Sequence, residues 1–235
     1  MSFINKFDVL LLDVGHTFMF GGYRFFNSED FAATYHSLGG TFLTDELVNQ
    51  IIFAVSRKIK VDGKNPAYYE CLPSVISYLE KHPQAKDLPA RELNLLEQVF
   101  ANHEVGVISG KHVEVLHQLG KTHRLGIISN IWSKKDIFLT EFDRVGIRDL
   151  FEIIVFSSDF GWIKPSTKLF NQAIEHFDVE REKIVYIGDH IMRDVGGAKT
   201  AGLSTVWINK SGKQLNESME IPDLIINDLQ ELISK

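Results

Sequence analysis

The side chains best suited to chemistry in this sequence stand where short apolar runs end. The run FDVLLLD ends at Asp13, and the run KIVYIGD ends at Asp189. An ionised carboxylate at the end of a buried strand is costly unless it is paired or binds a ligand. Other polar residues occupy similar places. The residues that stand at or near such ends are Asp13, Ser129, Asn130, Lys164, Asp189 and Asp194.

The three acidic residues of this set could share one cation. Carboxylates that converge on one edge of a sheet repel one another, raise one another's pKa values or bind a positive ion. Ligands that offer only oxygen suit a hard ion such as Mg²⁺. A lysine and a Ser–Asn pair beside that ion would complete a cradle for a phosphoryl group. The residue types therefore predict a Mg²⁺ site next to a phosphoryl-binding site.

The elements that must position these residues can be read from hydrophobic patterning. Six apolar runs, rich in Ile, Val and Leu, predict strands buried on both faces of a parallel sheet. Strand–helix alternation in the later part of the chain predicts an α/β doubly wound, mostly parallel sheet, which binds ligands beyond the carboxyl ends of its strands. The predicted strands span 7–13, 124–130, 151–158, 183–189, 204–209 and 223–227.

Local signals predict helices between the later strands. One helix is expected from Ser133 to Gly146, because Ser133 and Asp136 form a capping-box pattern and glycine is a common helix stop. Two more are expected over 164–177, with a proline in the first turn, and over 193–202, which ends in glycine.

A long insertion separates the first predicted strand from the second. The stretch TFMFGGYRFF (17–26) alternates around two glycines and predicts a small β-hairpin. Apolar residues at three- and four-residue spacing then predict a helical insertion over the end of the sheet. The helix-like pieces span 28–39, 44–60, 67–81 and 89–103. We therefore expect a core of residues 1–20 and 105–235 and a helical domain of residues 21–104, with the hairpin as a flap at its edge.

Composition limits the partners and the compartment. A formal net charge of -6 with scattered basic residues argues against nucleic acid as a partner. The lone Cys71 excludes an intramolecular disulfide and suits a reducing cytoplasm. The apolar run near the N-terminus is too short for a membrane helix and lacks the cleavage pattern of a signal peptide. We expect a cytoplasmic monomer or homodimer that acts on a small molecule and does not bind membranes.

Four ordered signals resemble one known family. They are LLDVGHT, GIISN, the KP of FGWIKPSTKLF and IGDHIMRDVGGAKTAG, each at a predicted strand end. Together they resemble the haloacid dehalogenase superfamily, whose members are mostly Mg²⁺-dependent phosphatases, over roughly residues 7–20 and 110–208. The resemblance implies a Rossmann-like core, and the insertion looks like the helical cap of the dehalogenase-like branch.

The resemblance also implies roles for the acidic residues. Asp13 would be the nucleophile that accepts the phosphoryl group as an aspartyl phosphate, which splits one difficult displacement into two easier ones. Mg²⁺ would be held by Asp13, Asp189 and the backbone carbonyl of Gly15. Asp194 would hold a water of the metal or orient Lys164.

The remaining signals would serve the phosphoryl group. By the same resemblance, Ser129 and the backbone near Asn130 would bind phosphoryl oxygens. Lys164 would neutralise their charge and that of Asp13, and Thr17 would form a hydrogen bond near the nucleophile.

The chain departs from the family pattern at Gly15. Family phosphatases usually carry a second aspartate there, which protonates the leaving group and later deprotonates the attacking water, a role worth roughly 10²–10⁴-fold in rate. His16 or His190 could replace it, since both adjoin the site in sequence. True dehalogenases and the phosphonate-cleaving branch also lack this aspartate. We expect a Mg²⁺-dependent phosphatase of a small phosphorylated metabolite; a 2-haloacid dehalogenase and a catalytically weakened binding protein are the alternatives.

Overall fold

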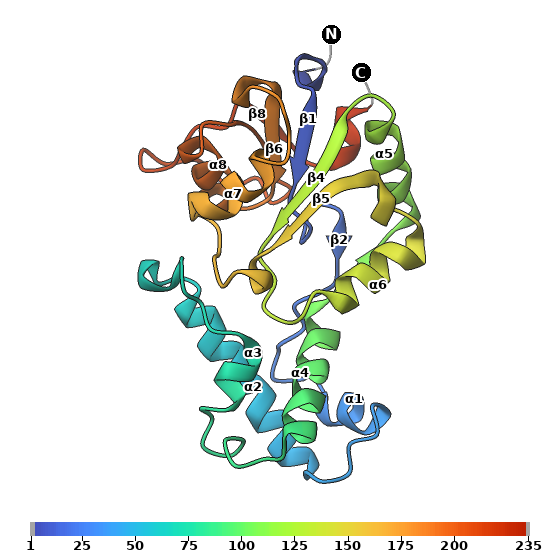
Figure 1. Ribbon diagram of the computed structural model, residues 1–235, viewed down its shortest axis with the longest axis vertical. Helices are drawn as coiled ribbons and strands as arrows, with labels where there is room; N and C mark the ends of the chain where they lie inside the picture. The colour runs from blue at the N-terminus through green and yellow to red at the C-terminus, as the bar shows by residue number, and fades with distance from the viewer. Residues whose placement is uncertain (1–2, 234–235) are drawn as a thin grey trace.

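A six-stranded parallel sheet forms the upper half of the molecule in Figure 1. The computed structural model describes residues 3–233. The strand order is β5-β4-β1-β6-β7-β8, with β1 between β4 and β6. The strands are β1 (Val9–Leu12), β4 (Arg124–Ser129), β5 (Phe151–Phe156), β6 (Ile184–Gly188), β7 (Ser204–Ile208) and β8 (Leu224–Ile226). All six predicted strands and the α/β doubly wound fold are confirmed.

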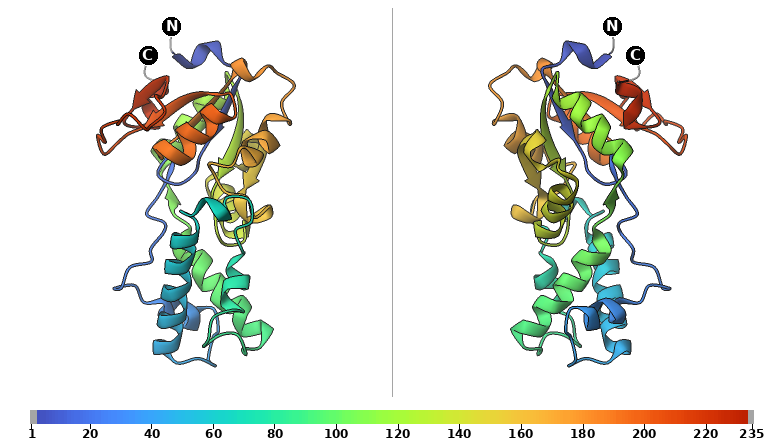
Figure 2. Two further views of the ribbon diagram at one scale, coloured as in Figure 1. Left: turned by 90° about the vertical axis from the view of Figure 1, so that its left-hand side faces the viewer. Right: turned by 90° about the vertical axis from the view of Figure 1, so that its right-hand side faces the viewer.

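Helices cover both faces of this sheet, as the two side views show (Figure 2). Leu10 and Leu12 of β1 belong to the cluster on the face of α5 (Gly110–Gly120) and α6 (Asp136–Val145). Val9 and Leu11, the other two residues of β1, belong to a second cluster on the opposite face. That cluster includes side chains of α7 (Thr167–Ile174) and α8 (Gly197–Thr200). Alternation between two buried faces explains why the strands are uniformly apolar.

Four helices lie below the carboxyl end of the sheet in Figure 1. We call this group the helical layer: α1 (Phe31–Ser37), α2 (Asp45–Asp62), α3 (Val75–Leu79) and α4 (Ala90–Glu104). Their apolar faces form a third hydrophobic cluster, which Trp132 and Ile163 join from the sheet side. Because two side chains from the sheet side complete this cluster, the helical layer is anchored beside the site.

The predicted hairpin over 17–26 is wrong. Met19 and Phe20 form β2, which pairs antiparallel with β3 (Val107–Ile108) rather than with the residues after the two glycines. A Cβ on Gly22 would stand 2.4 Å from the carbonyl oxygen of Glu104. The glycine therefore permits the outgoing and returning segments of the insertion to run side by side.

Two predicted helices also begin differently. The expected capping box of α6 is absent, because the hydroxyl of Ser133 donates to Glu104 and the helix begins at Asp136 without a side-chain cap. The piece predicted over 67–81 is helical only at its ends, as a 3₁₀ turn (Pro66–Tyr68) and as α3. Pro73 and the Ser74 cap interrupt it, since proline disfavours helix in the residue before it.

Candidate active site

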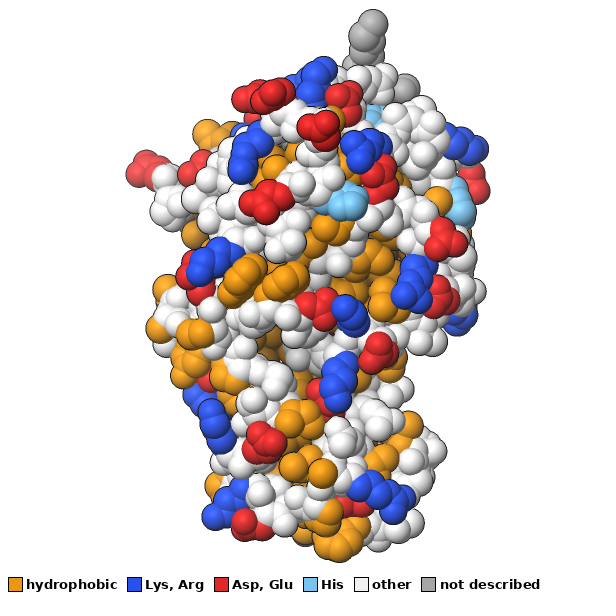
Figure 3. Space-filling model, viewed as in Figure 1, with side chains coloured by type: hydrophobic (Ala, Val, Ile, Leu, Met, Phe, Trp, Pro, Cys, Tyr) orange, Lys and Arg blue, Asp and Glu red, His pale blue; other side chains and the backbone are white. Residues whose placement is uncertain are grey.

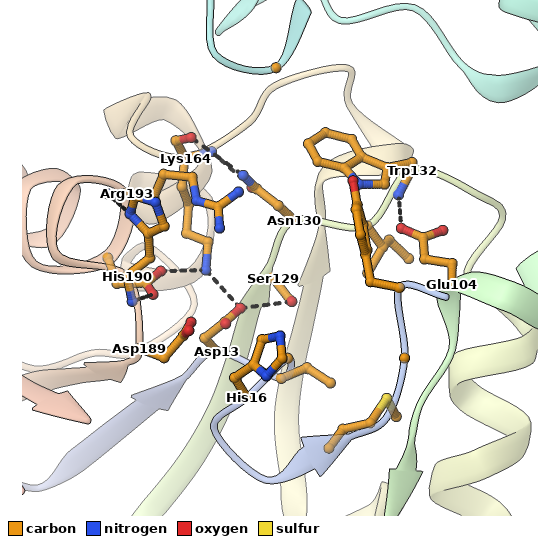
Figure 4. A pocket seen from close by; sticks show the side chains of 18 of the residues that line it. Asp13, His16, Glu104, Ser129, Asn130, Trp132, Lys164, Asp189, His190 and Arg193 are labelled. Atoms are coloured by element: carbon orange, nitrogen blue, oxygen red, sulfur yellow. Dashed lines mark hydrogen bonds and ion pairs between the residues drawn. The ribbon is translucent and has the colours of Figure 1, made fainter. Parts of the chain in front are cut away.

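Asp13 stands directly after β1, at the carboxyl edge of the sheet. Its backbone N–H donates to the carbonyl of Ile187 at 2.9 Å, which continues the pairing of β1 with β6 beyond the strand. Its Oδ1 accepts hydrogen bonds from Ser129 Oγ and Lys164 Nζ, both at 2.8 Å (Figure 4). Among residues 3–233 no donor reaches Oδ2 within hydrogen-bond distance. One oxygen is therefore fixed and the other is open.

Lys164 bridges the two sides of this site. Its side chain is 2% exposed, and Nζ donates to Asp13 Oδ1 at 2.8 Å, to Asp194 Oδ1 at 2.7 Å and to the Tyr186 hydroxyl at 2.7 Å. Burial opposes its charge, but the two carboxylates raise the pKa of Lys164. A permanently charged ammonium thus lies against Asp13.

The acidic residues meet as the sequence predicted. One carboxylate oxygen from each of Asp13, Asp189 and Asp194 lies within 4.8 Å of the others. Burial, reinforced by the charges of Asp13 and Asp194, raises the pKa of Asp189 to about 7. Burial also raises the pKa of Asp13. Three carboxylates this close together fit a hard divalent cation such as Mg²⁺, because the cation offsets their mutual repulsion.

Asp194 differs from the other two acids. It lies in a π-helical turn (Ile191–Gly196), a form often found at functional sites. Its Oδ2 accepts the backbone N–H of His190 at 2.8 Å. Although burial opposes ionisation, Lys164 lowers the pKa of Asp194. Asp194 was expected to hold a water of the metal or to orient Lys164, and the structure contains its hydrogen bond with Lys164.

Asn130 joins two loops at the sheet edge. Its Oδ1 accepts the backbone N–H of Lys164 at 2.9 Å, and its Nδ2 donates to the carbonyl of the same residue at 3.3 Å. The Asn130 side chain is thus used to hold the lysine segment in place, while Ser129 directly contacts the carboxylate of Asp13.

Residues 15–17 lie in the turn that follows Asp13. Gly15 and His16 line the cavity, and His16 has a φ of 56°. The hydroxyl of Thr17 is buried without a hydrogen-bond partner in the described chain, so its expected bond near the nucleophile is not formed here. A Cβ on Gly15 would meet no atom within 4 Å. The acid missing at this position is therefore not excluded by lack of space.

The two histidines near the site are not equivalent. His190 Nδ1 accepts the backbone N–H of Arg193 at 3.2 Å, so this nitrogen is engaged. Burial and the nearby Arg193 lower the pKa of His190 to about 4, and its ring is neutral at pH 7. A neutral imidazole is a poor proton donor. That leaves His16, which lines the same cavity and is drawn near Asp13 in Figure 4.

A cavity of ≈ 580 Å³ lies between the sheet edge and the helical layer. One wall carries the acids and Lys164. Ile59, Lys60 and Lys64 come from the end of α2 and the turn after it. Aromatic side chains complete the lining, with Tyr23, Tyr69 and Trp132 among them. This volume accommodates a whole ligand rather than one phosphoryl group.

The sequence analysis did not identify two residues that contribute to this site, Tyr186 and Glu104. The Tyr186 hydroxyl accepts from Lys164 and donates to the carbonyl of Ile128 at 2.9 Å. The signal for it was a lone hydroxyl in an otherwise aliphatic run. Glu104 accepts the backbone N–H groups of Trp132 and Ser133 at 2.7 and 2.9 Å, which ties α4 to the loop after β4. No signal in the sequence indicated that contact.

Within residues 3–233, no helix has the length and apolar character needed to cross a membrane.

Comparison with known proteins places the chain among hydrolases. Residues 69–208 match the family described as haloacid dehalogenase-like hydrolase. A glyceraldehyde 3-phosphate phosphatase of Methanopyrus kandleri is 36% identical over 201 residues, which cover 79% of this chain and 85% of the relative. The pyrimidine 5'-nucleotidase YjjG of Escherichia coli is 27% identical over 225 residues, which cover 88% of this chain and 94% of that protein.

A solved structure shares the fold. The HAD-hydrolase YfnB of Bacillus subtilis, solved with bound magnesium, superposes with a TM-score of 0.63 at 19% identity and covers 96% of each chain. The matched residues and the phosphatase relative lead to one conclusion: this chain belongs to the haloacid dehalogenase-like hydrolase family.

Proposed function

We propose that this hydrolase is a Mg²⁺-dependent phosphatase that cleaves phosphoric monoesters through an aspartyl phosphate on Asp13. The observation that carries the proposal is the meeting of Asp13, Asp189 and Asp194 within 4.8 Å, with Lys164 bonded to two of them. A buried group of acids at a sheet edge has no purpose in packing, because burying charge costs free energy unless the charge is used.

The donor set fits a hard cation at this point. Asp13, Asp189 and Asp194 would hold Mg²⁺, with the carbonyl of Gly15 as the further ligand that we infer. When bound, Mg²⁺ neutralises charge on the phosphoryl oxygens and so favours attack by an anion. A magnesium-bound relative of the same fold agrees with this choice. A metal-free dehalogenase would not need the two acids Asp189 and Asp194 on the metal side of the site.

The proposed reaction has two steps, both at the carboxylate of Asp13. Oδ2 of Asp13 attacks phosphorus, a P–O bond to the carboxylate forms, and the P–O bond to the leaving group breaks. Lys164 and Ser129 hold Oδ1 and so orient the attacking carboxylate. In the second step water attacks phosphorus, the bond between phosphorus and Oδ2 breaks, and inorganic phosphate leaves. The carboxylate is regenerated and the proton of the water goes to a base.

Gly15 leaves both proton transfers without the usual aspartate. The leaving oxygen takes its proton from His16 or from solvent, and the same group removes the proton of the attacking water. A leaving group that needs no proton therefore suffers least. We expect acyl and aryl phosphates to be better substrates than alkyl phosphates, because an alkoxide leaves poorly without an acid.

The proposal extends to substrate and location. The phosphatase and nucleotidase relatives favour a small phosphorylated metabolite as substrate. We infer that residues 21–104 act as a cap that covers this molecule, and that the protein works in the cytoplasm as a monomer or homodimer without nucleic acid or membrane partners.

The test is a panel of phosphate esters and 2-haloacids, run once with Mg²⁺ and once with EDTA. Phosphate release that depends on Mg²⁺ is the expected result. Halide release in EDTA would replace the proposal with a dehalogenase. If neither product forms on a broad panel while Mg²⁺ still binds, the protein is a binding member of the family.

A further inference from the structure

Two lysines of the helical layer face the cavity from the side opposite the acids. Lys60 belongs to the last turn of α2, and Lys64 follows one turn later, beyond the end of the helix. Both line the cavity. Among residues 3–233, no carboxylate lies within 4.0 Å of either ammonium group. This part of the cavity lining therefore includes two lysines that have no carboxylate partner among the described residues.

Two lysines near the cavity do have ion-pair partners. Lys58, on the same helix, forms an ion pair with Asp62 at 2.7 Å. Lys168, on the sheet side, forms one with Glu70 at 2.8 Å. These pairs already occupy the two carboxylates closest in sequence to the cavity lysines. Other described lysines, Lys81 and Lys183 among them, also have no carboxylate within 4.0 Å, so what distinguishes Lys60 and Lys64 is that they line the cavity. On the face in Figure 3 basic and acidic side chains are interspersed.

Lys60 and Lys64 carry like charges four residues apart in the sequence, and an anion that lies near both would offset their mutual repulsion. The end of a helix attracts cations, which explains why lysines are tolerated there. That attraction does not explain why both lysines line the cavity, whose other charged wall is arranged to take a phosphoryl group.

We propose that Lys60 and Lys64 bind a second anionic group, carboxylate or phosphate, on the alcohol side of the substrate. The substrate class is thus a phosphate monoester that carries another negative charge. This inference rests on the proposed function, because it assumes that the phosphoryl group lies at Asp13. A cavity of ≈ 580 Å³ with acids on one wall and lysines on the other leaves room for both groups.

The test compares substrates that differ only in the second charge. Glycerol 3-phosphate has one anionic group, 3-phosphoglycerate replaces its terminal alcohol with a carboxylate, and glycerol 1,3-bisphosphate adds a phosphate. We expect kcat/KM to be about tenfold higher for at least one of the doubly charged compounds, mainly through KM. Exposed ion pairs contribute at most about fivefold each, and two lysines take part. The doubly charged compound with the larger increase in kcat/KM shows whether the two lysines prefer a carboxylate or a phosphate.

Variants assign the preference to the two lysines. The double variant Lys60→Gln, Lys64→Gln should reduce the ratio of kcat/KM between doubly and singly charged substrates to about 1. Lys81→Gln is the matched control, since Lys81 is an exposed lysine of the helical layer that does not line the cavity. The control should keep the ratio of the parent protein.

A binding measurement separates failure of this inference from failure of the proposed function. Calorimetric titration of each compound in Mg²⁺ into Asp13→Asn, with and without the two lysine substitutions, gives the same ratio in Kd without turnover. A ratio near 1 in Asp13→Asn alone, or a ratio that the two lysine substitutions leave unchanged, would overturn the second anion site. Selective binding without phosphate release by the parent protein would preserve the site and reject the phosphatase.

Discussion

The two walls of the cavity are built on different principles. At the sheet edge, Lys164 is bonded to Asp13, Asp194 and Tyr186 before any substrate is present. On the helical layer, Lys60 and Lys64 face the cavity without a charged partner among the described residues. A prearranged set of charges suits a fixed reaction step, whereas unpartnered groups suit a ligand that brings their counter-charge. The contrast suggests that the sheet determines the reaction and the helical layer selects the substrate.

The largest expected effect is the loss of turnover when the proposed nucleophile at the sheet edge is replaced. Asp13→Asn removes the attacking oxygen but keeps the volume, so turnover should fall by about 10⁴-fold or more while the fold is retained. Phosphate release and circular dichroism check both parts. Activity near that of the parent would show that Asp13 is not the nucleophile. Substrate preference measured by binding should survive this substitution if the helical layer is responsible for it.

A second substitution restores the missing acid at the same wall. Gly15→Asp should raise alkyl-phosphate turnover by up to ~10²-fold and aryl-phosphate turnover much less. The open space around position 15 makes a folded variant the expectation. If the parent already hydrolyses both classes equally well, with chemistry rate-limiting, then His16 supplies the acid. In that case His16→Asn should cause a selective loss on the alkyl substrate.

Metal binding at the sheet edge should depend on pH. Because burial and two neighbouring acids raise the pKa of Asp189 to about 7, protons compete with Mg²⁺ below that pH. Apparent affinity should rise about tenfold per pH unit from 5.5 to 6.5 and level off above 7.5. Titration of the melting temperature with Mg²⁺ at each pH measures this. Asp189→Asn should bind weakly with a much flatter pH profile.

The same pKa shift has a consequence for stability without metal. A carboxylate whose pKa is higher in the folded state than in the unfolded chain contributes stability at low pH, which is lost as the pH rises towards the folded-state pKa. In EDTA the melting temperature should therefore fall between pH 4 and pH 7 relative to Asp189→Asn. Saturating Mg²⁺ should remove the difference at pH 7. An identical profile for both proteins in EDTA would contradict the raised pKa.

The smallest expected effect comes from removing the hydroxyl of a buried tyrosine. We compare one tyrosine of the sheet, Tyr186, with one of the helical layer, Tyr78. Tyr186→Phe removes an acceptor from Lys164 and a donor from the Ile128 carbonyl, so kcat should fall by about tenfold or less along with stability. Tyr78→Phe is the matched control in the helical layer, where its hydroxyl donates to Asp62 at 2.9 Å. The control should lose stability alone. If Tyr186→Phe and Tyr78→Phe lowered kcat equally, the account that only the sheet side carries the reaction would be wrong.

The sheet and the polar residues at its edge were predictable from the sequence because their signals are local. Each strand is a short run of Ile, Val and Leu that ends in a polar residue, and the fold brings those ends together. Asp13, Lys164 and Asp194 could therefore be placed near one another without coordinates. Tyr186 was missed because a hydroxyl within an apolar run gives no sign of which face it occupies.

The insertion was less predictable because its contacts are long-range. Gly21 and Gly22 resemble a hairpin turn, yet Gly22 is there because the chain passes close to Glu104. Ser133 resembles a helix cap, but its hydroxyl is taken by the same glutamate from 29 residues earlier in the chain. The positions of Lys60 and Lys64 over the cavity likewise depend on how the helical layer packs on the sheet.

The covalent step on Asp13 is the central claim, and one chemical trapping measurement tests it most directly. Since Gly15 provides no base for the second step, the aspartyl phosphate should accumulate during turnover of acetyl phosphate with Mg²⁺. Acid quenching at successive times, followed by borohydride reduction and peptide mass spectrometry, converts that species to homoserine. The account predicts homoserine at position 13 that requires both substrate and Mg²⁺ and that diminishes in Gly15→Asp. Phosphate release with Asp13 unmodified at every quench time would contradict it.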